Sequence, residues 1–276
     1  MIEESLTQWA GHAFPIGLGG ALLLLLLEEH WPEVSRRTTL GRRWLANAAA
    51  YAAATTVMRS LPFLSALGAA RFADTQGWGL FNSAPVPGWI AIAFGVVALD
   101  LAGYAVHRLE HRVPLLWRVH RLHHSDPDVD ATTAFRFHAF EIALIVAAEV
   151  VVVLALGVPV AAIVAYLLLS AVMSVLSHAN VSLPPAVDRA LRLIVITPRM
   201  HRVHHSIERV DYDSNFSVTL SFWDRLFRTY RHAPLRGDQG IVFGVVGRPV
   251  SQSVSIWRSL ADPFLPATAG SDAETR

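Results

Sequence analysis

The sequence predicts an all-α integral membrane protein with four to five transmembrane or hairpin helices and a cytoplasmic helical cap that carries groups of histidines. Composition predicts the membrane part, because 53% of the 276 residues are hydrophobic and the mean hydropathy is +0.39. These values are too apolar for an ordinary soluble domain. Spacing predicts the cap, because histidines recur three and four residues apart in polar segments that flank the apolar runs.

Three apolar runs lie at or before the first histidine group. Residues 13–27 form the first, and we expect a retained span because this run has neither a basic start nor a small-residue cleavage site. Residues 44–58 form an alanine-rich second run, followed by an arginine and a proline, so a short or broken span is expected. Residues 71–88 contain glycine, proline and asparagine and predict a loop. Residues 87–106 predict the next span.

The longest apolar stretch, residues 142–177, is too long for one span. As a single helix it would reach about 54 Å, against a hydrocarbon core of about 30 Å. Gly157 and Pro159 interrupt it and predict a helical hairpin that returns the chain to the side from which it came. Beyond it, residues 187–196 are expected to form a helix at the membrane interface, and the chain from Pro263 is expected to be a flexible tail.

Three histidine groups have the spacing of metal ligands on helices. HRLEH (107–111) is followed by HRLHH (120–124), and HRVHH (201–205) comes far downstream. On a helix, these spacings place the imidazoles of each group on one face. Pro114 suits the first turn of a second helix, and Thr197 followed by Pro198 predicts the start of a third. Chance would give roughly 0.03 HxxHH matches in such a chain, and two occur.

Eight imidazoles exceed what one ion can hold, so these groups predict a two-metal site. His178 is a ninth expected ligand and His138 a tenth, although Arg136 and Glu141 could equally hold His138 as a structural residue. The expected ligand set is His107, His111, His120, His123, His124, His138, His178, His201, His204 and His205. The chain has no cysteine, which excludes disulfides, iron–sulfur clusters and thiolate-bound zinc.

Several polar residues are expected to support the ligands. Asp100 and Tyr104 precede His107 by seven and three residues and share its helix face. A carboxylate that accepts the N–H of a ligand imidazole is the usual partner of such a site. The full set of expected catalytic or supporting residues is Asp100, Tyr104, Glu141, Asn180 and Asp224. Glu149, eight residues after Glu141, is expected to line a cavity or a helix contact.

The arginines predict the orientation in the membrane. They cluster after the first apolar run, among the first two histidine groups and after His178. Cytoplasmic segments are the ones enriched in basic residues, which puts the N-terminus outside and the histidine groups in the cytoplasm. A bacterial inner membrane is the expected location. Nucleic-acid binding is not expected, because the arginines flank apolar segments and form no basic domain.

The histidine groups, with His178 in SHAN, resemble the histidine boxes of the fatty acid hydroxylase / sterol desaturase superfamily. DLAGYAVHR, RFHAFE and NFSVTLSFWDRLFRTY resemble the segments that accompany those boxes, so the resemblance covers residues 88–232. The stretch from TPRMHRVHH to WDRLF is similar to the branch that contains alkylglycerol monooxygenase. Many members have HxxxH where this chain has His178 followed by Ser182, so one ligand of that pattern is missing.

The resemblance implies a membrane-bound non-haem enzyme with two iron ions that uses O2 to hydroxylate a lipid of fatty acyl, sterol, isoprenoid or alkylglycerol type. Residues 1–85 would form N-terminal spans and a loop, residues 86–235 the catalytic domain, and residues 236–276 a C-terminal segment and tail. No haem or flavin module is visible, so electrons would come from a partner protein. Zinc is the alternative metal in purified protein.

Two other activities are consistent with the same residues. A lipid desaturase would use the same site. A histidine-rich membrane metal transporter belongs to a different class, and it would place its ligands near the middle of the membrane, where only Asp100 and Glu149 are expected. A zinc metalloprotease of the HExxH type is not expected, because the chain contains no HExxH.

Overall fold

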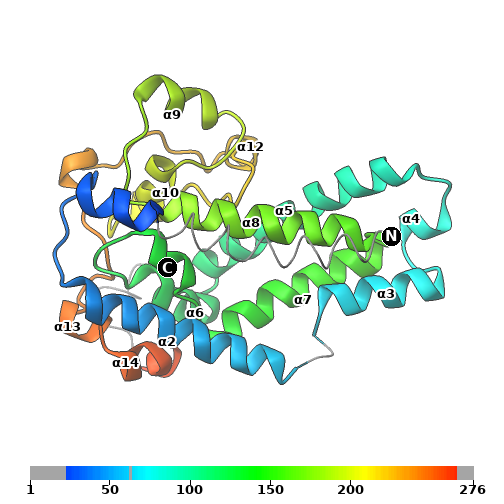
Figure 1. Cartoon of the computed structure of the whole chain (residues 1–276), viewed down its shortest axis with the longest axis horizontal. Coiled ribbons are helices and arrows are strands. Elements are labelled where there is room, and N and C mark those ends of the chain that lie inside the picture. Colours follow the sequence, from blue (N-terminus) through cyan, green and yellow to red (C-terminus); the bar gives the residue numbers. More distant parts are fainter. Residues whose placement is uncertain (1–22, 62–63, 266–276) are drawn as a thin grey trace.

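The computed structural model describes residues 23–61 and 64–265, and within them every regular element is a helix (Figure 1). The extended pairings among these residues are two isolated bridges, Val195 with Leu220 and Ser206 with Phe243. The predicted all-α class is therefore confirmed. Only part of the first apolar run can be compared, because residues 13–22 lie outside the described residues, whereas residues 23–30 are helical.

Among the described residues, three helices are long and apolar enough to cross a membrane. They are α5 (Gly88–Arg112), α7 (Ala139–Leu156) and α8 (Val160–His178). Helix α5 packs against both α7 and α8, the two arms of the hairpin (Figure 1). Buried side chains from all three helices, among them Leu99, Val153 and Ile163, form the core of this bundle. These helices confirm an integral membrane protein.

The expected hairpin is confirmed, and glycine makes its turn. Gly157 ends α7 with φ of 67°, in the left-handed region that a residue with a Cβ rarely adopts. A Cβ at Gly157 would also lie 2.7 Å from the carbonyl oxygen of Trp78, so the neighbouring chain occupies that space. Pro159 then precedes the first turn of α8. The glycine therefore allows both the reversal and a close approach of the N-terminal region.

The N-terminal region differs from expectation at two places. The alanine-rich run lies in one unbroken helix, α2 (Leu40–Arg59), which is not among the three apolar helices. The expected loop over residues 71–88 is wrong, because α3 (Ala66–Gln76) and α4 (Leu80–Ser83) occupy much of it. Ser65 caps α3 by accepting from the Gly68 amide, and the alanine face of α3 packs on α7. The glycine and proline content concealed this short packed helix.

Shorter helices lie at one end of the bundle, where they form a cap, and along its side (Figure 1). Pro114 begins α6, as predicted, and Thr197 caps α10 by accepting from the Met200 amide. The remaining elements are α6 (Pro114–His124), η1 (Ala131–Phe135), α9 (Pro185–Leu191), α10 (Pro198–His204), α11 (Arg209–Tyr212), α12 (Phe222–Leu226), η2 (Asp238–Gly240), α13 (Val250–Ser253), α14 (Ile256–Ala261) and η3 (Asp262–Phe264).

Two expectations for this cap are corrected. The helix predicted over residues 187–196 ends at Leu191, because residues 194–196 instead exchange backbone hydrogen bonds with residues 219–221. The chain does not become a free tail at Pro263. Arg121 of α6 donates to the carbonyl oxygens of Asp262 and Leu265, each at 2.7 Å. These bonds hold the end of the described chain against the histidine-bearing helix α6.

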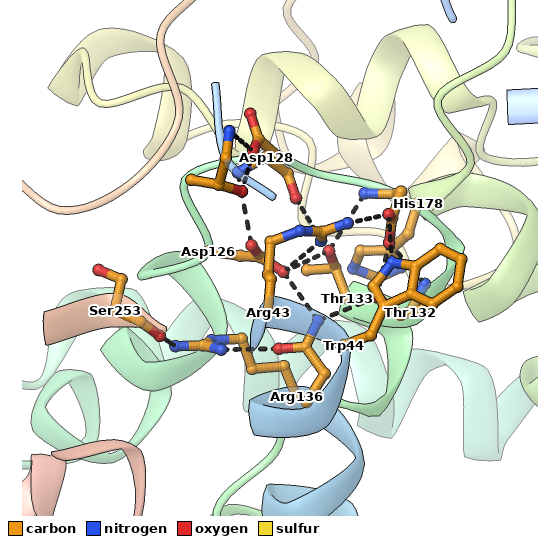
Figure 2. A network of polar contacts seen from close by, with 12 residues as sticks. Arg43, Trp44, Asp126, Asp128, Thr132, Thr133, Arg136, His178 and Ser253 are labelled. Carbon is orange, nitrogen blue, oxygen red and sulfur yellow. Dashed lines mark hydrogen bonds and ion pairs between the residues drawn. The ribbon is translucent and has the colours of Figure 1, made fainter. Parts of the chain in front are cut away.

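A buried polar network joins α2 to the loop that follows α6 (Figure 2). Arg43 is fully buried and donates to the Asp126 carboxylate at 3.1 Å, to the Asp128 carbonyl oxygen at 2.7 Å and to the Asp130 carboxylate. Asn47 donates to Asp126 at 3.0 Å and accepts from Arg136. The planar guanidinium satisfies several acceptors at once, which a lysine ammonium cannot reproduce. The network therefore anchors the loop between two parts of the candidate site.

Replacing Arg43 by lysine should destabilise the protein. The variant keeps the charge but loses the forked donors, and leaving buried acceptors without partners should lower the free energy of unfolding by roughly 3 kcal/mol. The measurement is thermal unfolding in detergent. Arg42→Lys, one residue earlier on the exposed face of α2, is the matched control and should unfold like the wild type. Equal unfolding of the two variants would contradict this role for the network.

Candidate metal centre

The structure brings nine histidines together at the end of the bundle in two adjoining buried groups. In each group, the candidate ligand atoms lie within 4.8 Å of one another. The rings of His124 and His204, from distant boxes, lie 4.6 Å apart, so the predicted convergence of these segments is confirmed. The first group is His107, His111, His120, His124 and His204, and the second is His123, His178, His201 and His205.

In the second group three Nε2 atoms lie close to the Nε2 of His178. His178 Nε2 lies 3.0 Å from that of His123, 2.9 Å from that of His201 and 3.2 Å from that of His205. One ring nitrogen offers a single hydrogen or a single lone pair, so hydrogen bonding cannot satisfy three such neighbours. Two nitrogens each about 2.1 Å from one ion, at right angles, would lie about 3.0 Å apart. The spacing therefore fits four imidazoles around one metal ion.

Backbone carbonyls hold the opposite ring nitrogen of several ligands. In each case Nδ1–H donates to a carbonyl oxygen, which leaves the lone pair on Nε2 and fixes the ring orientation. The pairs are His107 with Phe216 (2.8 Å), His178 with Ser174 (2.6 Å) and His204 with Ser214 (2.7 Å). The Nε2 atoms of His107 and His204 are buried and have no hydrogen-bond partner among the described residues. This combination is suited to metal binding.

Two glutamates hold His120. The Nδ1–H of His120 donates to the Glu141 carboxylate at 2.6 Å, and the Glu110 carboxylate lies 3.4 Å from the same nitrogen. All three side chains are buried. A carboxylate at Nδ1 raises the basicity of the ligand imidazole and fixes its tautomer. Glu110 and Glu141 therefore connect the first group to α5 and α7.

Burial keeps the imidazoles neutral. The pKa values of His201, His204 and His205 lie well below the usual value, first because burial removes water from the charged form and then because neighbouring histidines would repel that charge. The same causes lower the pKa values of His123 and His124. Neutral imidazole is the form that binds a metal, and an all-nitrogen set suits iron or zinc. The residues present therefore fit a pair of such ions.

Asp100 and Asp224 both bond to the segment of residues 216–223, which contains Phe216. Asp100 accepts from the Trp223 indole at 2.8 Å and from the Leu220 amide at 3.1 Å. Asp224 accepts from the Phe216 amide at 2.8 Å, and the carbonyl of Phe216 in turn holds His107. Neither aspartate makes a direct hydrogen bond to an imidazole among the bonds within the described chain. Their carboxylates act on the peptide segment that holds His107.

Tyr104 and Asn180 also pack around the site. The Tyr104 hydroxyl bonds to the Thr229 hydroxyl at 2.9 Å, and its ring packs against Phe216. Asn180 follows His178 and exchanges hydrogen bonds with the backbone of Val34, at 2.9 Å and 2.8 Å. Each of these side chains secures a segment that carries or holds a ligand.

His138 lies outside both groups. Its Nδ1 accepts from the Phe140 amide at the start of α7, and its Nε2 donates to the Leu260 carbonyl at 3.3 Å. Both ring nitrogens are thus used in the structural role that the sequence left open. His30 and His232 also lie outside the groups. His12 lies outside the described residues.

Sequence reasoning missed Glu110 and the carbonyl acceptors. Glu110 stands inside HRLEH, directly before His111, and its place between two ligands was the available signal. Asp213, whose carboxylate lies 3.9 Å from His111 Nδ1, was also missed. The carbonyls of Ser174, Ser214 and Phe216 carry no signal in the sequence, since every residue has one.

Comparison with known proteins agrees with this geometry. The family model for fatty acid hydroxylase matches residues 92–229. An ornithine lipid hydroxylase of Rhizobium tropici is 30% identical over 173 residues, which cover 63% of this chain and 50% of that protein. Human alkylglycerol monooxygenase is 32% identical over 161 residues, covering 57% of this chain and 33% of its own length. The chain thus spans half or less of these relatives. No solved structure gives a significant match.

The purified protein should bind one metal ion in each of the two histidine groups. Protein made in iron-replete cells should hold close to two ions per chain, because each group presents at least four imidazoles. His201→Ala leaves three imidazoles in its group and should reduce the content by about one ion, measured by elemental analysis of purified protein. The double change of His107 and His204 to alanine leaves three in the other group and should have the same effect. His138→Ala should retain both ions, because its ring nitrogens bond to backbone groups. A full metal content in His201→Ala would contradict the ligand assignment.

Proposed function

Because the chain belongs to the fatty acid hydroxylase family, whose model matches 138 of its 276 residues, we propose that it is a membrane-bound di-iron lipid hydroxylase. The observation that carries this proposal is the pair of buried histidine groups at the end of an apolar helical bundle. The proposed ligands are the nine histidines of the two groups. His138 is left out because backbone groups occupy both its nitrogens.

The reaction sets what the site must provide. Hydroxylation of a C–H bond by O2 consumes two electrons and two protons and yields the alcohol and water. Bound iron would supply the O2 binding and the electron transfer that side chains cannot provide. No thiol is available in this chain as a redox group. The electrons are therefore proposed to come from an external donor protein.

The chain's own residues position and isolate the site. The Glu141 carboxylate accepts from His120 Nδ1–H, with Glu110 beside the same nitrogen, so that His120 Nε2 keeps its lone pair for a ligand bond. The carbonyls of Phe216 and Ser214 do the same for His107 and His204. All these imidazoles are buried, so bulk water is kept from the reacting atoms.

The proposed substrate is a membrane lipid. The matched relatives are named as hydroxylases or monooxygenases of an ornithine lipid and of alkylglycerols. The helices α5, α7 and α8 lead from the hydrocarbon region to the histidines, so an acyl or alkyl chain could reach the site without leaving an apolar environment. Desaturation at the same site is the second candidate, because it would use the same residues, O2 and electrons but would remove two hydrogen atoms from the lipid in place of adding an oxygen atom.

The site is proposed to face the cytoplasm of a bacterial cell. Arginines are concentrated on the segments that carry the histidines, and such segments stay on the cytoplasmic side of an inner membrane. The α7–α8 hairpin supports this arrangement, because it lets the first two groups and the third meet on one side.

Reporter fusions test the topology. Fusions after Arg43 and after Arg209 should both report the cytoplasm, because one segment precedes the bundle and the other follows the hairpin on the same face. The measurement is the activity of paired cytoplasmic and periplasmic reporters. Opposite locations for the two fusion points would contradict the assembly of the site.

Labelling with 18O2 tests the reaction. Lipid extracts of cells that express the wild type should contain a species with one added 18O atom, which extracts of cells expressing His120→Ala should lack. His30→Ala changes an exposed histidine outside both groups and should give the labelled product at close to the wild-type level. Mass spectrometry of the lipids is the measurement, and it also identifies the substrate.

The same experiment separates the alternatives. A wild-type product that has lost two hydrogens and carries no label would assign desaturation. Identical lipids from the wild-type and His120→Ala strains, with both proteins well expressed, would contradict the enzyme proposal and favour a metal transporter.

A further inference from the structure

Two chain segments beside α5 form one unit, which we call the wedge and define as residues 192–196 and 216–227. The Ile196 amide donates to the Thr219 carbonyl at 2.9 Å, and the Ser221 amide donates to the Ile194 carbonyl at 3.0 Å. Val195 and Leu220 form an isolated antiparallel bridge. The wedge is thus a compact, mostly irregular structure that contains the short helix α12.

The wedge is attached to the middle of a membrane-spanning helix. Asp100 lies halfway along α5, seven residues or about 10 Å before His107 on the membrane side. It accepts hydrogen bonds from the Leu220 amide and the Trp223 indole. One turn later Tyr104 stacks on Phe227, with ring centroids 5.2 Å apart. These contacts place residues 220–227 of the wedge beside the middle of α5, on the membrane side of the histidines.

Irregular backbone can lie at that depth only if its polar groups are satisfied internally. The amides of Phe216 and Ser217 donate to the two oxygens of Asp224, at 2.8 Å and 3.1 Å. The Leu220 amide donates to Asp100, and the Ser221 amide donates to the Ile194 carbonyl. The two aspartates therefore accept hydrogen bonds from backbone amides of this segment. In a helix or a closed sheet, such amides would donate to backbone carbonyls.

The outer surface of the wedge is apolar. Leu193, Ile194 and Leu226 are 63%, 65% and 63% exposed, and Phe222 is 38% exposed. Side chains of this kind in contact with water would be unfavourable, whereas contact with acyl chains would not be. Exposed arginines lie nearby in the sequence, at Arg189 and Arg228, and can extend to the lipid headgroups. In Figure 1, α9 and α12 lie on one side of the α5–α8 pair.

We propose that the wedge is embedded in the bilayer and that Leu193, Ile194, Phe222 and Leu226 contact acyl chains. The occupant is lipid because Asp100 and Tyr104 set the wedge at the level of a membrane span, where a soluble partner has no access. The carbonyl of Phe216, within the wedge, holds His107 at 2.8 Å. The wedge therefore ties the depth of the histidine groups to the depth of the surrounding lipid chains. This placement rests on the membrane bundle and not on the proposed reaction.

Single-cysteine labelling tests the wedge, since the natural chain contains no cysteine. Ile194→Cys and Leu226→Cys, each labelled with an environment-sensitive fluorophore, are reconstituted as full-length protein with its metal in phosphatidylcholine vesicles. Acyl chains brominated along their length should quench both labels. Leu168→Cys on α8 is the lipid-facing control and Leu235→Cys the aqueous control. The two leucines are equally exposed at 58%, but Leu235 is attached to Asp211 of α11 and not to α5.

Brominated acyl chains should quench the labels at positions 194 and 226 to within about twofold of the label at position 168. The quenching should be at least several-fold stronger than that of the label at position 235. Iodide in the buffer should give the reverse order. If iodide quenched the labels at positions 194 and 226 as strongly as the label at position 235, the proposal would be wrong. The wedge would then face water, as a surface that binds another protein does. Leu193→Cys and Phe222→Cys repeat the measurement if either first variant loses its metal.

Discussion

Nine buried imidazoles whose ring nitrogens face one another are the constraint on which the rest of the structure depends. A buried polar atom without a partner costs roughly 1–3 kcal/mol, so an empty cluster of this size would be strongly destabilising. The cluster becomes favourable when Nε2 binds a metal and Nδ1 donates to a fixed acceptor. The surrounding protein provides such acceptors for four of the nine imidazoles, from the carbonyls of Ser174, Ser214 and Phe216 and from the carboxylate of Glu141.

The histidines are held in position because the helices that carry them make contacts on more than one face. On α6, the histidines point into the cluster, while Arg121, between His120 and His123, reaches the backbone of residues 262–265 on the other side. The loop after α6 is held in turn by Arg43 and Asn47 of α2. The segments that position the centre therefore extend beyond residues 92–229, the part that the family model matches.

Asp100 illustrates how far sequence reasoning reaches. Its position seven residues before His107 predicted a carboxylate on the ligand-bearing face, and it lies on that helix, buried. Its oxygens, however, accept from Leu220 and Trp223, more than a hundred residues downstream, and not from an imidazole. Periodicity can assign a side chain to a face of a helix, but it cannot say which distant segment packs on that face. Glu110 was missed for the related reason that its partner, His120, belongs to another helix.

Local chemistry was sufficient for much of this protein. Histidine spacing, the prolines that begin α6 and α10, and the glycine between α7 and α8 act through neighbouring residues, so the sequence alone determined the helical class, the hairpin and nine histidines that converge. Only the tertiary structure decided how those histidines divide between two groups and which acceptor each one meets. It also decided that His138 bonds to backbone groups instead. These outcomes depend on contacts between segments far apart in the chain, whose geometry is set by packing and not by any local pattern.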